Sequence, residues 1–111
     1  MPAMTPELSI IVPAYNEEAM IVNSLTSLQS CLASRSESYE IIVVDDGSRD
    51  KTVAIIQEWQ SHNKTDLHIL VNRQNMGKGF SIRRGVFESR GQYVIFTDAD
   101  LPYDLNAIDG F

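Results

Sequence analysis

The sequence predicts a three-layer α/β/α domain with a mainly parallel sheet, and three observations lead to this expectation. Four short apolar runs alternate with three longer amphipathic segments. The second and fourth runs are nearly continuous in apolar residues, which is typical of strands buried on both faces of a parallel sheet. A chain of 111 residues is long enough for one hydrophobic core, and it contains neither a linker nor a longer repeat.

We expect four strands, over residues 8–13, 39–45, 67–72 and 92–98. Their isoleucine and valine residues favour extended backbone. Neighbouring parallel strands need crossover connections, and these are right-handed. Because a doubly wound sheet commonly continues past its fourth strand, we expect residues 1–111 to form the first part of a larger domain, truncated after that strand.

We expect three helices, each with apolar residues on one face, over residues 17–34, 50–62 and 79–90. In the first, Ile21 and Leu25 begin a stripe that continues at helical spacing. Ser48 or Asp50 is expected to cap the second helix. Gly85 is expected to let the third helix approach the sheet closely.

The composition excludes some classes of function. The net charge is −6 and the pI is about 4.7, which does not fit a nucleic-acid-binding protein. The single cysteine, Cys31, cannot form an internal disulfide, so we expect a reducing, cytoplasmic compartment. No signal peptide is apparent, and no apolar run approaches the roughly 20 residues of a membrane span. His62 and His68 lack metal-ligand spacing and are interpreted as surface or strand-edge residues.

Polar residues follow every expected strand. They are Pro13-Ala14-Tyr15-Asn16-Glu17, Asp45-Asp46-Gly47-Ser48, the stretch from Asn72 to Gly79, and Asp98-Ala99-Asp100. Ligands of open α/β sheets bind outside the carboxyl ends of the strands. We therefore expect all four segments to meet at one edge, and this convergence is a stronger signal than any single motif.

The first two segments have structural alternatives. Glu17 and Glu18 could simply favour the start of a helix through its dipole. Asp45-Asp46-Gly47-Ser48 could be a turn in which glycine supplies a positive φ. However, adjacent carboxylates at a strand end are costly unless they are used, and an aspartate there can accept hydrogen bonds from a base or a ribose.

The third segment resembles a phosphate loop only weakly, because Gly77-Lys78-Gly79 lacks the full P-loop pattern. It does open a helix, where backbone N–H groups favour anions. Lys78, Arg83 and Arg84 are locally basic, although Arg84 could equally lie on a solvated helix face.

Asp98-Ala99-Asp100 is the sharpest signal. Residues two apart in an extended segment point the same way. Two such carboxylates can hold one hard cation, and Mg²⁺ and Mn²⁺ prefer oxygen ligands and often keep substrate phosphate in their coordination shell. As a plain turn, the pair would place two repelling charges together with nothing gained.

Four motifs in this order resemble the family 2 glycosyltransferases. They are IIVPAYNEE, IIVVDDGSRDKT, NMGKGFSIRRG and GQYVIFTDADL. The last two look closest to the branch that transfers glucose or mannose to dolichyl or other polyprenyl phosphates. The resemblance implies the Rossmann-like nucleotide-diphospho-sugar transferase fold, and a place at the cytoplasmic face of a membrane for the full-length protein.

The resemblance also implies roles for individual residues. The nucleotide pocket would be lined by Pro13, Ala14, Tyr15 and Glu17. The base would be contacted by Asp46, with Val44, Asp45 and Gly47 beside it. Lys78 and Arg83 would lie near the nucleotide, and Asp98 with Ala99 would face the ribose or the diphosphate. Asp98 and Asp100 would ligate Mg²⁺ or Mn²⁺, which neutralises the departing nucleoside diphosphate. Such enzymes invert the anomeric centre by direct displacement.

The implied function is hexose transfer from UDP-glucose or GDP-mannose to a polyprenyl phosphate. One alternative is a family 2 transferase with a saccharide acceptor. The catalytic base is expected beyond Phe111 with the acceptor half, so the chain as given is expected to bind nucleotide weakly and transfer nothing. A non-catalytic binding or receiver-like module is disfavoured because Asn72, not an aspartate, ends the third strand. A nucleotidyltransferase is also disfavoured, because it would have a glycine-rich loop after the first strand and residues 13–17 contain no glycine.

Overall fold

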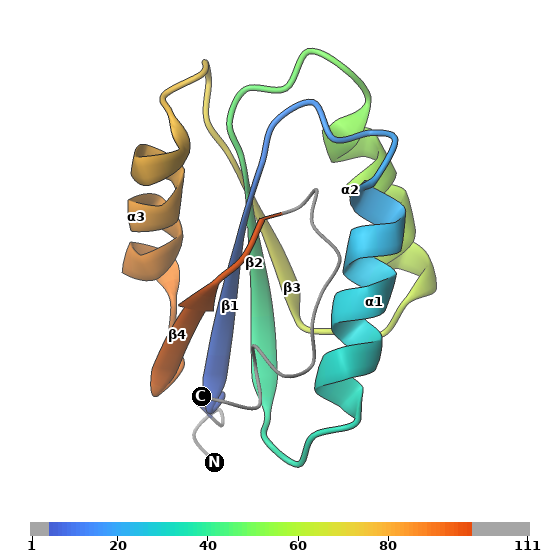
Figure 1. The fold of residues 1–111 in the computed structure, drawn as a ribbon, viewed down its shortest axis with the longest axis vertical. Coiled ribbons are helices and arrows are strands. Elements are labelled where there is room, and N and C mark those ends of the chain that lie inside the picture. The colour runs from blue at the N-terminus through green and yellow to red at the C-terminus, as the bar shows by residue number, and fades with distance from the viewer. Residues whose placement is uncertain (1–4, 99–111) are drawn as a thin grey trace.

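The computed structural model describes residues 5–98 and shows a four-stranded sheet between two layers of helices (Figure 1). The strands are β1 (Leu8–Ala14), β2 (Tyr39–Asp45), β3 (Leu67–Val71) and β4 (Tyr93–Phe96), and the helices are α1 (Ile21–Ala33), α2 (Thr52–His62) and α3 (Lys78–Glu88). The strands pair in parallel in the order β3-β2-β1-β4. The predicted α/β/α architecture is therefore confirmed.

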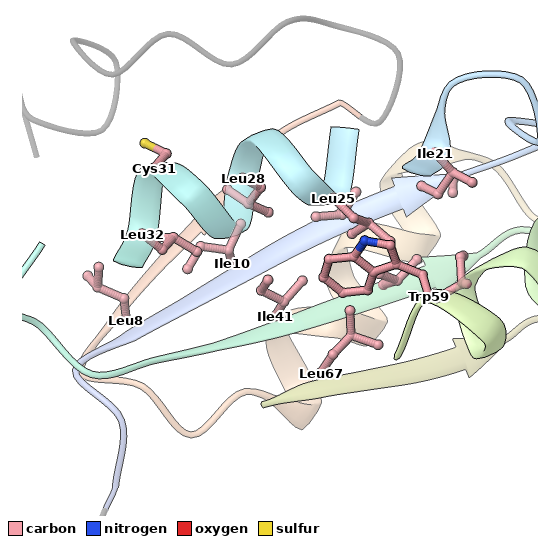
Figure 2. Packing of buried hydrophobic residues seen from close by; sticks show 14 residues of the cluster. Leu8, Ile10, Ile21, Leu25, Leu28, Cys31, Leu32, Ile41, Trp59 and Leu67 are labelled. Carbon is pink, nitrogen blue, oxygen red and sulfur yellow. The ribbon is translucent and has the colours of Figure 1, made fainter. Parts of the chain in front are cut away.

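The central strands β1 and β2 are buried on both faces. Burial on both faces was predicted for the second and fourth strands, and it is confirmed for β2. It is wrong for β4, because β4 lies at the edge of the described sheet with Tyr93 57% and Phe96 58% exposed. Side chains alternate across a strand, so Ile10 and Ile41 face α1 and α2, whereas Ile11 and Val44 face α3. Figure 2 shows the larger cluster, in which helix residues such as Leu25 and Trp59 meet the strands. Burying each such side chain stabilises the fold by about 1.5–3 kcal/mol relative to leaving it exposed.

Among the helices within residues 5–98, α3 is the one that covers the other face of the sheet (Figure 1). A Cβ atom added to Gly85 would lie 2.5 Å from Cγ2 of Ile11 and 3.2 Å from Cγ2 of Val44. Only glycine leaves room for the helix backbone at this distance, which confirms the close approach predicted for Gly85.

Two helices begin later than predicted, and α3 ends at Glu88, two residues before the predicted end. The helix expected from Glu17 begins at Ile21. The N–H groups of Met20 and Ile21 both bond to the carbonyl of Glu17, which closes a turn before the helix. Helix α2 begins at Thr52 with Lys51 at its N-cap position, so the predicted cap at Ser48 or Asp50 is wrong. Asp50 instead accepts the Thr52 backbone N–H at 3.0 Å from just before the cap. Within residues 5–98, no helix combines the length and the hydropathy that crossing a membrane would require.

The chain reverses its direction of travel across the sheet after β3. It runs outward from β1 through β2 to β3, and α3 then carries it back to β4 on the far side of β1. In open α/β sheets this kind of switch point leaves a crevice outside the carboxyl ends of the strands. The loops after β1, β2 and β3 meet at that edge (Figure 1).

Candidate functional site

A cavity of about 360 Å³ lies at the carboxyl edge of the sheet, between the ends of β1 and β4 and the start of α3. It is lined by Pro13, Ala14, Tyr15, Glu17, Asp46, Asn75, Gly77, Lys78, Ser81 and Asp98. This volume lies within the roughly 300–1,000 Å³ of small-molecule sites. All four segments expected to converge at this edge contribute to the lining.

Some of the predicted site residues lie elsewhere. Val44 is fully buried beneath α3 with Ile11 and Ile42, so it supports the sheet and does not reach the cavity. Arg83 is exposed on α3 and does not line the cavity. Ala99 and Asp100 lie outside the described residues.

Asp45 shapes the turn after β2. Its carboxylate is buried, accepting the Ser48 backbone N–H at 2.9 Å and the Ser48 hydroxyl at 2.5 Å. The hydroxyl oxygen of Ser48 in turn accepts the backbone N–H of Asn16 at 2.8 Å. Asp45 therefore stabilises the turn after β2, which was the structural alternative considered for the Asp45-Asp46 pair.

The loops after β1 and β2 are joined by reciprocal hydrogen bonds. The backbone N–H of Glu17 donates to Oγ1 of Thr52 at 2.8 Å, and the backbone N–H of Arg49 donates to Oδ1 of Asn16 at 2.8 Å. Asn16 has a φ of 51°, a left-handed conformation that asparagine tolerates better than most residues. These bonds hold Tyr15 and Glu17 at the cavity wall.

Asp46 joins the turn after β2 to the loop before α3. Its Oδ1 accepts the backbone N–H of Met76 at 2.7 Å and the side-chain amide of Asn72 at 2.9 Å, while its Oδ2 accepts the backbone N–H of Gly77 at 2.9 Å. Burial opposes ionisation, but the bonds from Met76, Asn72, Gly77 and Ser81 outweigh it and hold the pKa of Asp46 below its ordinary value. Asp46 is thus an ionised carboxylate in the cavity wall.

Lys78 and Asp98 form an ion pair at the mouth of the cavity. Lys78 is the first residue of α3, and Asp98 follows β4 by two residues, so the pair joins the helix to the strand across the switch point. The Asp98 side chain is 33% exposed, which leaves its carboxylate accessible to a ligand. A carboxylate is a ligand that Mg²⁺ and Mn²⁺ prefer, so the donor chemistry fits the predicted metal.

A second group of possible metal ligands lies at the opposite edge, where the strands begin. Ligand atoms of Glu40, Asp66 and His68 lie within 4.8 Å of one another. The guanidinium of Arg90 already lies between the two carboxylates, with Nη2 at 3.1 Å from Glu40 and 3.2 Å from Asp66. The guanidinium of Arg90 already neutralises charge in this group, so a metal ion there would have to displace it. His68, predicted as a strand-edge residue, is about half exposed.

The prediction did not include three residues of the cavity lining, Asn75, Gly77 and Ser81. Asn75 and Gly77 belong to the same motif as Lys78. Ser81 lies one helical turn after Lys78, so helical spacing would have placed both on one face. Ser81 is fully buried, which explains why a small residue is found there.

Comparison with known proteins places these features in a family. Residues 9–109 match the family model described as "Glycosyl transferase family 2". The chain is 38% identical over 99 residues to the dolichyl-phosphate beta-glucosyltransferase of Dictyostelium discoideum, covering 84% of this chain and 30% of that relative. It is 39% identical over 108 residues to the dolichol-phosphate mannosyltransferase of Mycosarcoma maydis, covering 94% of this chain and 36% of that relative.

A solved structure shows the same fold. The mannosyltransferase PcManGT from Pyrobaculum calidifontis, in complex with GDP-Man and Mn²⁺, superimposes with a TM-score of 0.78 at 25% identity. The match covers 95% of this chain and 32% of that one. The chain therefore spans about a third of the length of the proteins it matches.

Proposed function

We propose, from the fact that this chain belongs to glycosyl transferase family 2, that its cavity binds the nucleotide-diphospho-sugar donor of a hexosyltransferase. One observation carries the proposal: Asp46, Lys78 and Asp98, from three separate segments, line one cavity at the switch point of the sheet. A nucleotide-sugar needs a hydrogen-bond acceptor for its base and positive charge for its diphosphate. The cavity offers both.

Each residue has a proposed role. The ionised carboxylate of Asp46 accepts a hydrogen bond from the base, and Pro13 and Tyr15 form the wall beside it. The ammonium of Lys78 lies near the diphosphate, where it offsets negative charge. Asp98 faces the ribose or the diphosphate. In this assignment residues 1–111 are the donor-binding part of the domain, and Val44, Asp45 and Gly47 support the pocket from behind.

A divalent cation, Mg²⁺ or Mn²⁺, is proposed as the cofactor, with Asp98 and Asp100 as its protein ligands. The solved mannosyltransferase similar to this chain contains Mn²⁺ together with GDP-Man. When bound, the cation supplies a Lewis acid that neutralises charge on the leaving nucleoside diphosphate. Lys78 adds a second positive charge on the α3 side of the same cavity.

For the whole protein, we propose transfer of glucose or mannose to dolichyl or another polyprenyl phosphate. The names of the relatives at 38–39% identity support this acceptor. The test is to incubate the whole protein with polyprenyl phosphate and radiolabelled UDP-glucose or GDP-mannose. Labelled glycolipid in the organic phase is the expected result. Label found only in a soluble saccharide would contradict the lipid acceptor.

Donor binding is tested on this chain by titration calorimetry with UDP-glucose and with GDP-mannose, each with and without Mn²⁺. We expect weak binding of one nucleotide-sugar that Mn²⁺ strengthens. Lys78→Gln should weaken it, whereas Lys64→Gln, an equal change on an exposed residue before β3, should not. No binding of either compound in the presence of Mn²⁺ would overturn the proposal.

A further inference from the structure

Asn72 is a buried polar residue that the proposed function has not yet used. It directly follows β3, and its side chain is 4% exposed. Its backbone N–H donates to the carbonyl of Asp45 at 2.8 Å, which extends the pairing of β2 and β3 by one step. The backbone of Asn72 is therefore fixed beside the end of β2, underneath the start of α3.

The side-chain amide of Asn72 has partners on every side. Its Nδ2 donates to Oδ1 of Asp46 and to Oγ of Ser81, both at 2.9 Å. Its Oδ1 accepts a hydrogen bond from Nη1 of Arg84 at 2.7 Å. A guanidinium can only donate and an ionised carboxylate can only accept, so these two partners impose one orientation on the amide. A flipped amide would direct N–H groups at the guanidinium and oxygen at the carboxylate.

The Asp46 carboxylate, which accepts a hydrogen bond from the Asn72 amide, also accepts two consecutive backbone N–H groups, those of Met76 and Gly77. Gly77 has a φ of 98°, a conformation that glycine adopts readily. The same loop also packs tightly on Gly47, where an added Cβ would lie 2.7 Å from the backbone carbon of Gln74. The next residue, Lys78, begins α3 and lines the cavity.

We infer that Asn72 is a positioning residue of the donor site: its amide orients the Asp46 carboxylate, which holds the Met76–Gly77 backbone and so places Lys78 in the cavity. The hydrogen bonds that connect Asn72 to Lys78 through Asp46 all join residues within 5–98. Its consequence for nucleotide affinity rests on the proposed function.

The substitution Asn72→Asp isolates this role because it preserves size and shape. It keeps an acceptor for Arg84 but replaces the N–H donor that lies 2.9 Å from Asp46 with a second carboxylate oxygen. The two like charges repel, and one of them must turn away or bind a proton. The orientation of Asp46 is then lost while the packing volume is unchanged. Asn23→Asp, an identical change on an exposed residue of α1, is the matched control.

Two measurements test the inference. Amide hydrogen exchange by NMR reports the Met76 and Gly77 bonds without any ligand, and we expect their protection to fall about tenfold in Asn72→Asp, as for the loss of one hydrogen bond. Titration with UDP-glucose and GDP-mannose in Mn²⁺ should show about tenfold weaker binding. Both values should match wild type in Asn23→Asp.

Lowering the pH should restore the protection of Met76 and Gly77 in Asn72→Asp, which a role of Asn72 in packing alone would not predict. A protonated carboxyl group at position 72 can again donate to Asp46, with Arg84 as the other charged group facing it. The ratio of variant to wild-type protection at Met76 and Gly77 should therefore rise toward one as the pH falls. Should Asn72→Asp not fold, Asn72→Ala, which introduces no charge, is expected to lower the same two protections.

The outcomes separate the two proposals. Unchanged protection at Met76 and Gly77 in the folded Asn72 variants would overturn the positioning role. If neither wild type nor Asn23→Asp binds a nucleotide-sugar, the proposed function is wrong, and the exchange data still decide the role of Asn72. If wild type binds a nucleotide-sugar and Asn72→Asp binds it with equal affinity, the inference would also be overturned.

Discussion

Arg90 donates three hydrogen bonds to the buried carboxylate of Glu40. Its backbone N–H bonds to Oε2 at 2.7 Å, and its Nε and Nη2 bond to Oε1 at 3.2 and 3.1 Å. The Ser9 hydroxyl adds a fourth donor, 2.6 Å from Oε2. Glu40 is 1% exposed, so a charge at the start of β2 is held by the residues that lead into β4 and by β1.

The first prediction concerns this buried carboxylate. Glu40→Gln should lower the free energy of unfolding by about 1–3 kcal/mol, because the new amide presents N–H groups to a site where every partner is a donor. Urea unfolding followed by the fluorescence of Trp59, the sole tryptophan, measures the change. Glu58→Gln, on the exposed face of α2, is the control and should stay within about 0.5 kcal/mol of wild type.

The second prediction is a pH dependence. Burial opposes ionisation of Glu40, but hydrogen bonds from Ser9 and Arg90 outweigh it and hold its pKa below the usual 4.5. A lowered folded pKa means that the unfolded chain binds the proton more readily, so the stabilisation is complete above that usual value and is lost as the pH falls through the folded pKa. Urea unfolding between about pH 6 and about pH 3 should show this loss. A Glu40→Gln variant with an equally steep decline would contradict the assignment to Glu40.

The third prediction contrasts two neighbouring glycines. Gly77→Ala should destabilise the protein by about 1–3 kcal/mol, because φ is 98° there, although within residues 5–98 no atom beyond its chain neighbours lies within 4 Å of the added Cβ. Gly79→Ala, inside α3 and equally open, should instead stabilise it by about 0.5 kcal/mol through reduced unfolded-state entropy. Thermal unfolding of both variants measures the contrast, and equal effects would show that the positive φ of Gly77 is not the cause.

The fourth prediction concerns the contact of α3 with the sheet. Gly85→Ala should cost about 1–3 kcal/mol, because its Cβ would lie 2.5 Å from Cγ2 of Ile11 and the helix must move outward. Chemical denaturation measures the loss, with Gly79→Ala as the control for adding a methyl group to the same helix. A neutral result would mean that α3 can shift without strain.

The fifth prediction distinguishes the two groups of carboxylates. Asp98→Asn should weaken Mn²⁺-dependent nucleotide binding about tenfold, as for the loss of a charged ligand. Asp66→Asn, the same change at the opposite edge, should leave the Mn²⁺ dependence unchanged because Arg90 occupies that group. Calorimetry with and without Mn²⁺ compares them. The reverse pattern would place the metal beside Glu40 and His68.

The sequence alone predicted the α/β/α architecture and the meeting of four polar segments at one edge of the sheet. The pattern of apolar residues can be recognised within each short segment, so the strand 39–45 was predicted with the bounds that β2 has in the structure. Parallel strands place their carboxyl ends at one edge, and for that reason Asp46, Lys78 and Asp98 could be assigned to one site before any packing was known.

The tertiary structure decided what each side chain does at that edge. Pro13 and Val44 are register partners on adjacent strands and share a face of the sheet, yet Val44 packs in the core beneath α3 whereas Pro13 lines the cavity. Asp45 binds its own turn, whereas Asp46 binds a loop 30 residues away. Likewise, the delayed start of α1 follows a turn whose Glu17 N–H bonds to Thr52, 35 residues later. Local propensity is set within a few residues, but such partners meet only when the sheet and helices have packed.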